Sequence, residues 1–280
     1  LNAKDILTDL CATAEGFDAE APCKDSKDTR NPGKISLFAR IFGGKTPKIS
    51  NANCTSFRAH HGMIQGAREI SEIAQKIVVK ELESHPDYTL VLVGHSLGAG
   101  TAAVLGAMWN DVFPNLVVYG YGCPCVFPLA ADARFRSSII SIVGMHDPFS
   151  TLSLGHLADI SVALAQLCED EDLRKAADDR CAIKAQDMSK DDLSWAFNAM
   201  NALRENMISE KLYPPGRILL ISGPSQNGND GKVQIQEVQQ ERFKEIMLHP
   251  RLLDISMHVP NRYEDELRVL WNSYQNGSKS

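Results

Sequence analysis

A serine between two glycines is the first feature of this sequence that points to a chemistry. Ser96 is the centre of residues 94–98, GHSLG, which have the form GxSxG. An apolar, β-branched run precedes this motif and an alanine-rich run follows it, so the pattern predicts a strand, a sharp turn and a helix. Such a turn exposes the hydroxyl of Ser96 and directs the N–H of Leu97, at the helix start, toward a forming oxyanion. The motif therefore predicts a nucleophilic serine.

The two flanking glycines follow from the same turn. A strained turn at the serine brings backbone segments close together, so a side chain at Gly94 or at Gly98 is expected to collide with them. The sequence thus predicts that both positions require glycine.

A serine hydroxyl attacks an ester only with the help of a base, and in this type of fold the chain order is Ser, Asp, His. Eight histidines are present, and four of them follow the motif: His146, His156, His249 and His258. The base is expected in a loop after the last strand, which leaves His249 and His258. Position favours His258, because it comes directly before a predicted helix.

The orienting carboxylate is expected beyond the end of another parallel strand. Asp147 follows the apolar run 138–143 and precedes Pro148. Taken alone, it would be interpreted as a turn former. Asp132 and Asp159 are the alternatives, and both are expected on the surface. The serine and histidine candidates together favour Asp147.

The elements that must position these residues alternate between strand and helix. The predicted strands cover residues 88–94, which are expected to be buried, 116–120 and 138–143, followed by a hairpin of 217–223 and 232–238. The predicted helices cover 62–84, 97–109, 157–177, 191–210 and 263–274. This order indicates an α/β fold with a mostly parallel central sheet covered on both faces by helices. Residues 157–210 form a helical insertion before the last strands.

Length and composition fit one such domain. The 280 residues are 44% hydrophobic and are expected to form a single catalytic domain, residues 1–280. No apolar run approaches the roughly 18 residues of a membrane span. The start at Leu1 suggests a piece of a longer chain. The seven cysteines match neither a zinc site nor a disulfide scaffold, so reduced thiols are expected, with Cys123 and Cys125 buried.

Residues 24–58 differ from the rest of the chain in charge. Basic residues outnumber acidic ones eight to two there, whereas the net charge of the whole chain is −6. Within this insert, residues 34–42, KISLFARIF, would form a short helix with a broad apolar face. Such a helix suits a lid over an apolar site or an anionic membrane surface. A solvated loop with a few buried side chains is an equal alternative.

Several stretches together resemble the class 3 lipases. They are VGHSLGAGTAA around Ser96, HHGM at 60–63, GMHDPFSTLSLG at 144–155 and MHVPNRYEDEL at 257–267. LYPPGRI at 212–218 and LTDL at 7–10 narrow the resemblance to the sn-1-specific diacylglycerol lipases. The matching stretches are scattered over nearly the whole chain.

The resemblance implies an α/β-hydrolase fold with Ser96 as nucleophile, Asp147 as carboxylate and His258 as base. It implies a glycerolipid ester as substrate and no cofactor or metal. Relatives of this type carry transmembrane helices before a catalytic domain that faces the cytosol, so association with the cytoplasmic face of a membrane is expected. A second oxyanion donor follows an Arg-Gly pair in the family, and that motif is expected upstream of Leu1.

Other functions share these residues. The same triad could act on phospholipid, or transfer the acyl group to an alcohol as an acyltransferase. A scaffold that binds lipid without turnover is a further alternative, against which stand all three triad candidates in the expected order.

Overall fold

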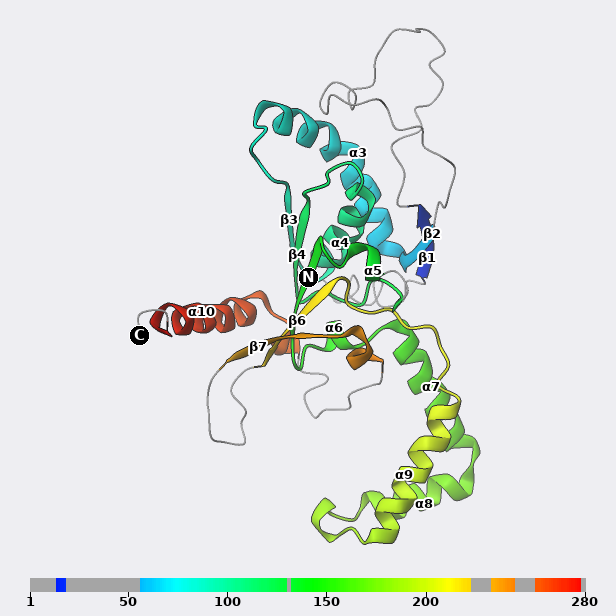
Figure 1. Ribbon diagram of the computed structural model, residues 1–280. Helices are drawn as coiled ribbons and strands as arrows, with labels where there is room; N and C mark the ends of the chain where they lie inside the picture. The colour runs from blue at the N-terminus through cyan, green and yellow to red at the C-terminus, as the bar shows by residue number, and fades with distance from the viewer. Residues whose placement is uncertain (1–13, 19–55, 130–131, 223–232, 245–254, 278–280) are drawn as a thin grey trace, which may run out of the picture.

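The computed structural model describes residues 14–18, 56–129, 132–222, 233–244 and 255–277. Its main feature is a five-stranded sheet with the order β3-β4-β5-β6-β7 (Figure 1). The strands are β3 (Val91–His95), β4 (Val117–Tyr121), β5 (Ile139–Gly144), β6 (Arg217–Ser222) and β7 (Gln234–Val238). The first four run parallel and β7 is antiparallel to β6. The predicted mostly parallel sheet and its closing hairpin are confirmed.

Two helices cover one face of the sheet. They are α3 (His61–Ser84) and α4 (Leu97–Trp109), which pack on each other and, through α4, on β3 and β4. The apolar positions of α3 repeat every three to four residues, so Met63, Ile64 and Ala67 are buried in the largest core cluster. Trp109, at the end of α4, also joins the two helices, because its indole N–H donates to the buried hydroxyl of Ser71 in α3 at 2.9 Å. Both helices agree with the predicted ranges.

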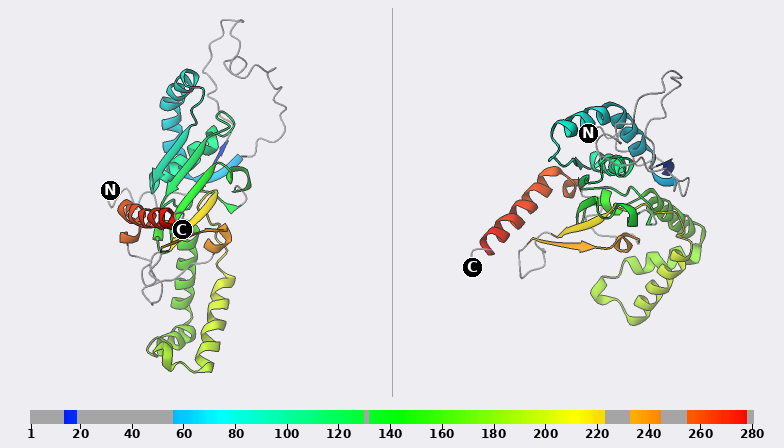
Figure 2. Two further views of the ribbon diagram at one scale, coloured as in Figure 1. Left: turned by 60° about the vertical axis from the view of Figure 1, so that its left-hand side comes forward. Right: turned by 45° about the horizontal axis from the view of Figure 1, so that its top comes forward.

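The opposite face of the sheet is less covered by described helices than the sequence predicted. Among the described residues, it packs mainly against the start of α10 (Pro260–Gly277), where Tyr263 joins Ile142 and Ile221 in a small cluster. The rest of α10 extends away from the sheet (Figure 2). β3 is an edge strand whose side chains Val91 and Val93 are 47% and 64% exposed. The prediction of a buried first strand is wrong, because described helices cover only one of its faces.

The insertion 157–210 is helical, as predicted, but three long helices rather than two form it. They are α7 (Leu154–Glu169), α8 (Glu171–Cys181) and α9 (Lys190–Glu205), and they project from the sheet as an arm (Figures 1 and 2). The predicted single helix 157–177 is broken at Asp170, whose carboxylate accepts the Leu173 N–H at 2.8 Å and so starts a new helix. The second predicted helix ends at Glu205 rather than at 210.

The remaining elements are short. β1 (Ala14–Asp18) and β2 (Ser56–His60) form an antiparallel pair that the sequence did not predict. The short helices are α5 (Asp132–Phe135), α6 (Pro148–Thr151) and the 3₁₀ turns Ala185–Asp187, Gln240–Phe243 and Ile255–Met257. Within the described part of the chain, no helix has the length and apolarity needed to cross a membrane. Most of the basic insert, including 34–42, lies outside the described residues.

Candidate active site

Ser96 occupies the turn between β3 and α4. Its backbone has φ 56° and ψ −128°, and among the described residues it is the only non-glycine with positive φ. Such a conformation costs about 1–3 kcal/mol and persists only where surrounding structure holds it. Here the N–H of Ser96 donates to the carbonyl of Tyr121 at 3.0 Å, which fixes the turn to the end of β4. The strand, strained serine and helix agree with the predicted turn.

The two flanking glycines are not equivalent. A Cβ on Gly94 would lie 2.3 Å from the carbonyl oxygen of Gly98, whereas a Cβ on Gly98 would meet nothing within 4 Å. The expectation that both positions need glycine is therefore correct for Gly94 and wrong for Gly98. At position 98 the first turn of α4 faces open space, so the backbone leaves room for a side chain.

This asymmetry gives a matched pair of variants. Gly94→Ala should lower the free energy of unfolding by about 3 kcal/mol or more, because the turn must open to admit the new methyl group. Gly98→Ala should change it by less than about 1 kcal/mol, since alanine also favours the helix. Urea unfolding followed by circular dichroism measures both. Equal destabilisation by the two substitutions would contradict this account of the turn.

His258 lies between the 3₁₀ turn Ile255–Met257 and the start of α10. Its Nε2 is 2.6 Å from Ser96 Oγ, and its Nδ1 is 2.7 Å from Asp147 Oδ2. The ring of Phe149 packs on the His258 ring with centroids 4.4 Å apart. With the proton on Nδ1, the imidazole donates to the carboxylate and accepts from the serine hydroxyl. The competing candidate, His249, lies outside the described residues.

Asp147 follows β5 and caps α6. Its Oδ1 accepts the backbone N–H groups of Phe149 at 2.9 Å and Ser150 at 3.3 Å. Its Oδ2 accepts from His258 and from the hydroxyl of Tyr263. The side chain is fully buried. Two backbone donors and two side-chain donors thus compensate for the loss of water around the carboxylate and fix its orientation.

Two further residues, Tyr263 and Gly122, lie beside Asp147 and His258, and the sequence did not predict them. The Tyr263 hydroxyl accepts the N–H of Gly144 at 2.9 Å and donates to Asp147. Burial, followed by the nearby carboxylate, raises the pKa of Tyr263 well above its ordinary value, so its hydroxyl keeps the proton that it donates. Gly122 has φ +54°, and a Cβ there would lie 3.1 Å from Cε1 of His258.

The other candidates are not part of this arrangement. His156 is buried in the first turn of α7, where it bonds to Ser153 and to the carbonyl of Lys244. Asp159 is also fully buried, in an ion pair with Lys211 at the base of the arm, so its expected surface position is wrong. Nothing is described of the side chain of Asp132, and His146 lies beside Asp147 in the chain.

The cysteines next to β4 agree with the sequence prediction. Cys123 and Cys125 are buried and unpaired. Burial raises the pKa of the Cys123 thiol to about 12 and raises that of Cys125 as well. Neither thiol is therefore a thiolate at neutral pH, and neither is suited to redox or nucleophilic chemistry.

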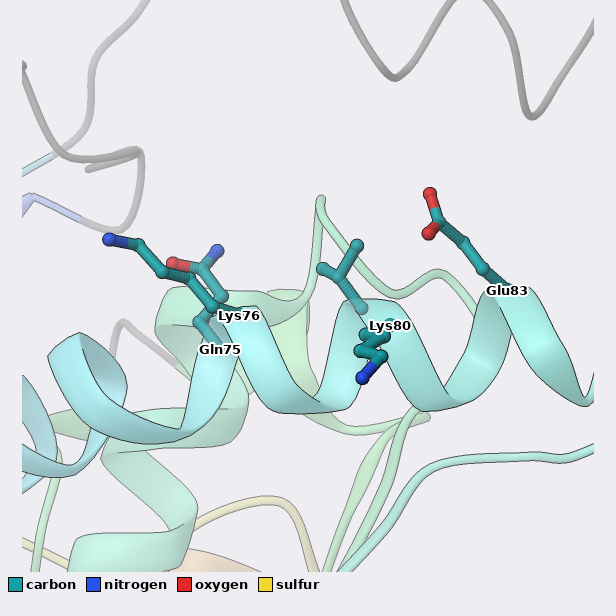
Figure 3. Close-up of a pocket in the computed structure, with 5 residues that line it drawn as sticks. Gln75, Lys76, Lys80 and Glu83 are labelled. Atoms are coloured by element: carbon teal, nitrogen blue, oxygen red, sulfur yellow. The ribbon is translucent and has the colours of Figure 1, made fainter.

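The structure also has a hollow along the C-terminal half of α3 (Figure 3). It has a volume of about 360 Å³ and is lined by Gln75, Lys76, Val79, Lys80 and Glu83. All five come from the C-terminal half of one helix, whereas Ser96, Asp147 and His258 lie at the ends of strands β3 and β5 and before α10. We therefore do not assign the hollow to a substrate of the serine site.

A mostly parallel sheet with a serine on the turn from a strand into a helix defines the α/β-hydrolase class. Residues 34–155 match the family described as Lipase (class 3). This match confirms, over the segment that it covers, the resemblance to the class 3 lipases seen in the sequence.

Individual relatives agree with the family. The chain is 33% identical to mouse (Mus musculus) diacylglycerol lipase-beta over 107 residues, covering 36% of this chain and 16% of that protein. It is 26% identical to rat (Rattus norvegicus) diacylglycerol lipase-alpha over 251 residues, covering 78% of this chain and 23% of that protein. The chain thus spans less than a quarter of the length of these curated relatives.

Similarity to solved structures is weak. The MDLA mutant from Penicillium cyclopium has a TM-score of 0.42 and 15% identity, covering 77% of this chain and 60% of that one. The mono- and diacylglycerol lipase from Aspergillus oryzae has a TM-score of 0.34 and 22% identity, covering 43% of this chain and 46% of that one.

Proposed function

We propose that this chain is a serine lipase that hydrolyses an acyl ester of diacylglycerol or a related glycerolipid through an acyl-enzyme intermediate. The observation that supports this most is the continuous series of hydrogen bonds from Asp147 through His258 to Ser96. In the proposal these residues are the carboxylate, the base and the nucleophile, and the N–H of Leu97 is an oxyanion donor.

The proposed reaction has two halves. His258 takes the proton of Ser96 as Oγ attacks the ester carbonyl, and then gives it to the departing glycerol oxygen. Water repeats the cycle on the acyl-enzyme. Asp147 holds the imidazole in the tautomer that can accept this proton. Leu97 is the first residue of α4, so its N–H has no hydrogen-bond acceptor within the helix. This N–H can therefore bond to the oxyanion.

Apolar side chains beside the reacting groups favour a lipid substrate. Leu97 follows Ser96 in the chain, Val259 follows His258, and Ile255 lies three residues before it; Leu97, Ile255 and Val259 are 36%, 59% and 43% exposed. Single exposed apolar residues are common on proteins. Residues of this kind next to a nucleophile and its base provide an apolar border for acyl chains. The names of the diacylglycerol lipase relatives support the same substrate class.

A water-insoluble substrate implies work at a lipid surface. We therefore propose that the protein acts in contact with a membrane or a lipid droplet. The cytoplasmic face of a membrane stays a prediction from the family resemblance. A lid formed by residues 34–42 stays a prediction from the apolar pattern of that segment.

A panel of substrates tests the proposal. The chain and its Ser96→Ala variant would be incubated with micellar diacylglycerol, triacylglycerol and phosphatidylcholine, with and without an added alcohol, and the products separated by mass. We expect free fatty acid and monoacylglycerol to form fastest from diacylglycerol, and only with the parent chain. Release from phosphatidylcholine alone, or acyl transfer to the alcohol in place of water, would replace the proposal with a phospholipase or an acyltransferase.

A fluorophosphonate probe separates a hydrolase from an inactive scaffold. Such probes react with activated serines, so the parent chain should be labelled at Ser96 and the Ser96→Ala variant should not. A folded parent chain that neither takes up the probe nor releases fatty acid would favour a scaffold that binds lipid without turnover.

A further inference from the structure

His95 makes a contact that the proposed mechanism does not use. It is the last residue of β3 and the residue directly before Ser96. Its Nε2 lies 2.8 Å from the backbone carbonyl oxygen of His258. A carbonyl oxygen only accepts, so His95 is the donor and carries a proton on Nε2. One side chain thus joins the strand that holds the serine to the backbone of the histidine.

In the part of the chain that the structure describes, the segment that carries His258 is also attached further along, where the Tyr263 hydroxyl bonds to the N–H of Gly144 and to Asp147. The N–H of His258 donates to the carbonyl of Ile255 at 3.0 Å, within the same segment. On the other side, α10 contributes Tyr263 and the partly buried Leu267 to a cluster on the sheet, while Val269 and Trp271 further along are exposed. The bond from His95 adds an attachment of the His258 backbone directly beside Ser96.

Ring contacts reinforce the bond. The centroids of the His95 and His258 rings are 4.9 Å apart, and Tyr263 lies edge-on to His95 with centroids 6.0 Å apart. His95 thus contacts the backbone and the ring of His258, and also the tyrosine that bonds to Asp147. Rotation of the His258 ring away from the serine would have to break this packing.

We infer that His95 is a positioning residue: its hydrogen bond to the His258 carbonyl and its contact with the His258 ring hold Nε2 of His258 against Ser96 Oγ. This inference rests on the proposed function, in which His258 is the base. It gives a residue inside the GxSxG motif a task distinct from the turn itself.

The charge of His95 fits this task. Burial lowers the pKa of His95, and the hydrogen bond to the His258 carbonyl only partly opposes that effect. A neutral ring keeps the Nε2–H donor. It also adds no positive charge beside His258, which becomes an imidazolium when it takes the serine proton in the proposed mechanism. The groups that face His95 are His258, Tyr263 and, through electrostatic attraction, Asp147.

Two substitutions separate the hydrogen bond from simple packing. His95→Leu replaces the ring by an apolar side chain of similar length that lacks the N–H donor. His95→Gln keeps an amide N–H near the place of Nε2. With a soluble nitrophenyl ester, we expect kcat of His95→Leu to fall roughly 10- to 100-fold with little change in KM, because a misplaced base slows the chemical step. His95→Gln should recover most of this loss.

Amide hydrogen exchange provides a readout that does not depend on activity. We expect the amides of residues 255–262 to exchange faster in His95→Leu than in the parent chain, and His95→Gln to stay close to the parent. Circular dichroism and the melting temperature should show that both variants fold.

The outcomes distinguish the inference from the proposed function. If both variants keep the parent kcat and exchange pattern, or if both lose them equally, His95 does not act through this hydrogen bond. If the parent chain itself has no activity, the proposed function fails, and the exchange comparison alone decides whether His95 holds the segment. Faster exchange in His95→Leu with recovery in His95→Gln supports it, and equal exchange overturns it.

Discussion

Ser96→Ala is expected to lower kcat for ester hydrolysis about a millionfold, as in other hydrolases that depend on a serine nucleophile. The reason is specific to the proposed reaction, because without Oγ no acyl-enzyme can form. The N–H of Leu97 and the bound geometry remain, so a small residual rate is expected. Release of nitrophenol from a soluble ester, followed over hours at high enzyme concentration, measures this loss without interference from lipid aggregation.

A second substitution at the same position serves as the control for folding. Ser96 has φ 56°, a conformation that glycine adopts freely and that strains alanine as much as serine. We therefore expect Ser96→Gly and Ser96→Ala to be equally inactive, with Ser96→Gly more stable by about 1 kcal/mol. Parent-level turnover by either folded variant would disprove the role of Ser96.

The local part of the site could be predicted from the sequence. A β-branched run, a glycine-flanked serine and an alanine-rich run specify strand, turn and helix through neighbouring residues alone. The order of elements then placed Asp147 after β5 and His258 before α10. In the structure His258 lies within hydrogen-bond distance of Ser96, and Asp147 lies within hydrogen-bond distance of His258. Chain order was sufficient here because the ends of parallel strands meet at one edge of the sheet.

Contacts between distant segments could not be predicted in this way. The hydroxyl of Tyr263 reaches Asp147, which is more than a hundred residues earlier, and nothing in the pattern around Tyr263 distinguishes it from a helix residue that packs on the core. Asp159 was expected on the surface, but its ion pair with Lys211 depends on how the arm returns to the sheet. Such pairings are decided by tertiary structure rather than by local propensity.

Burial was the least predictable property of β3. Its residues are apolar and β-branched, which is typical of a central parallel strand. In the structure it is an edge strand with α4 on one face, so Val91 and Val93 remain exposed on the other. The composition of a strand indicates which surfaces it can bury, but the number of its neighbours depends on the rest of the chain.

Asp147→Asn is expected to lower kcat roughly ten-thousandfold, as in other serine triads. The backbone N–H groups of Phe149 and Ser150 both point at one oxygen of Asp147, so the amide of asparagine must keep its oxygen there. Its NH₂ group then faces Nδ1 of His258, which must accept rather than donate. The histidine proton moves to Nε2, and this nitrogen can no longer accept the proton of Ser96.

Tyr263→Phe is the matched control for this argument. It removes one donor to Asp147 but keeps the carboxylate, and therefore the tautomer of His258, so its loss in kcat should stay within about 30-fold. Both variants leave the two backbone bonds at the start of α6 intact, and their melting temperatures should reveal any common loss of folding. If asparagine at position 147 costs no more than phenylalanine at position 263, the carboxylate does not set the tautomer. Another acidic residue would then have to orient the base.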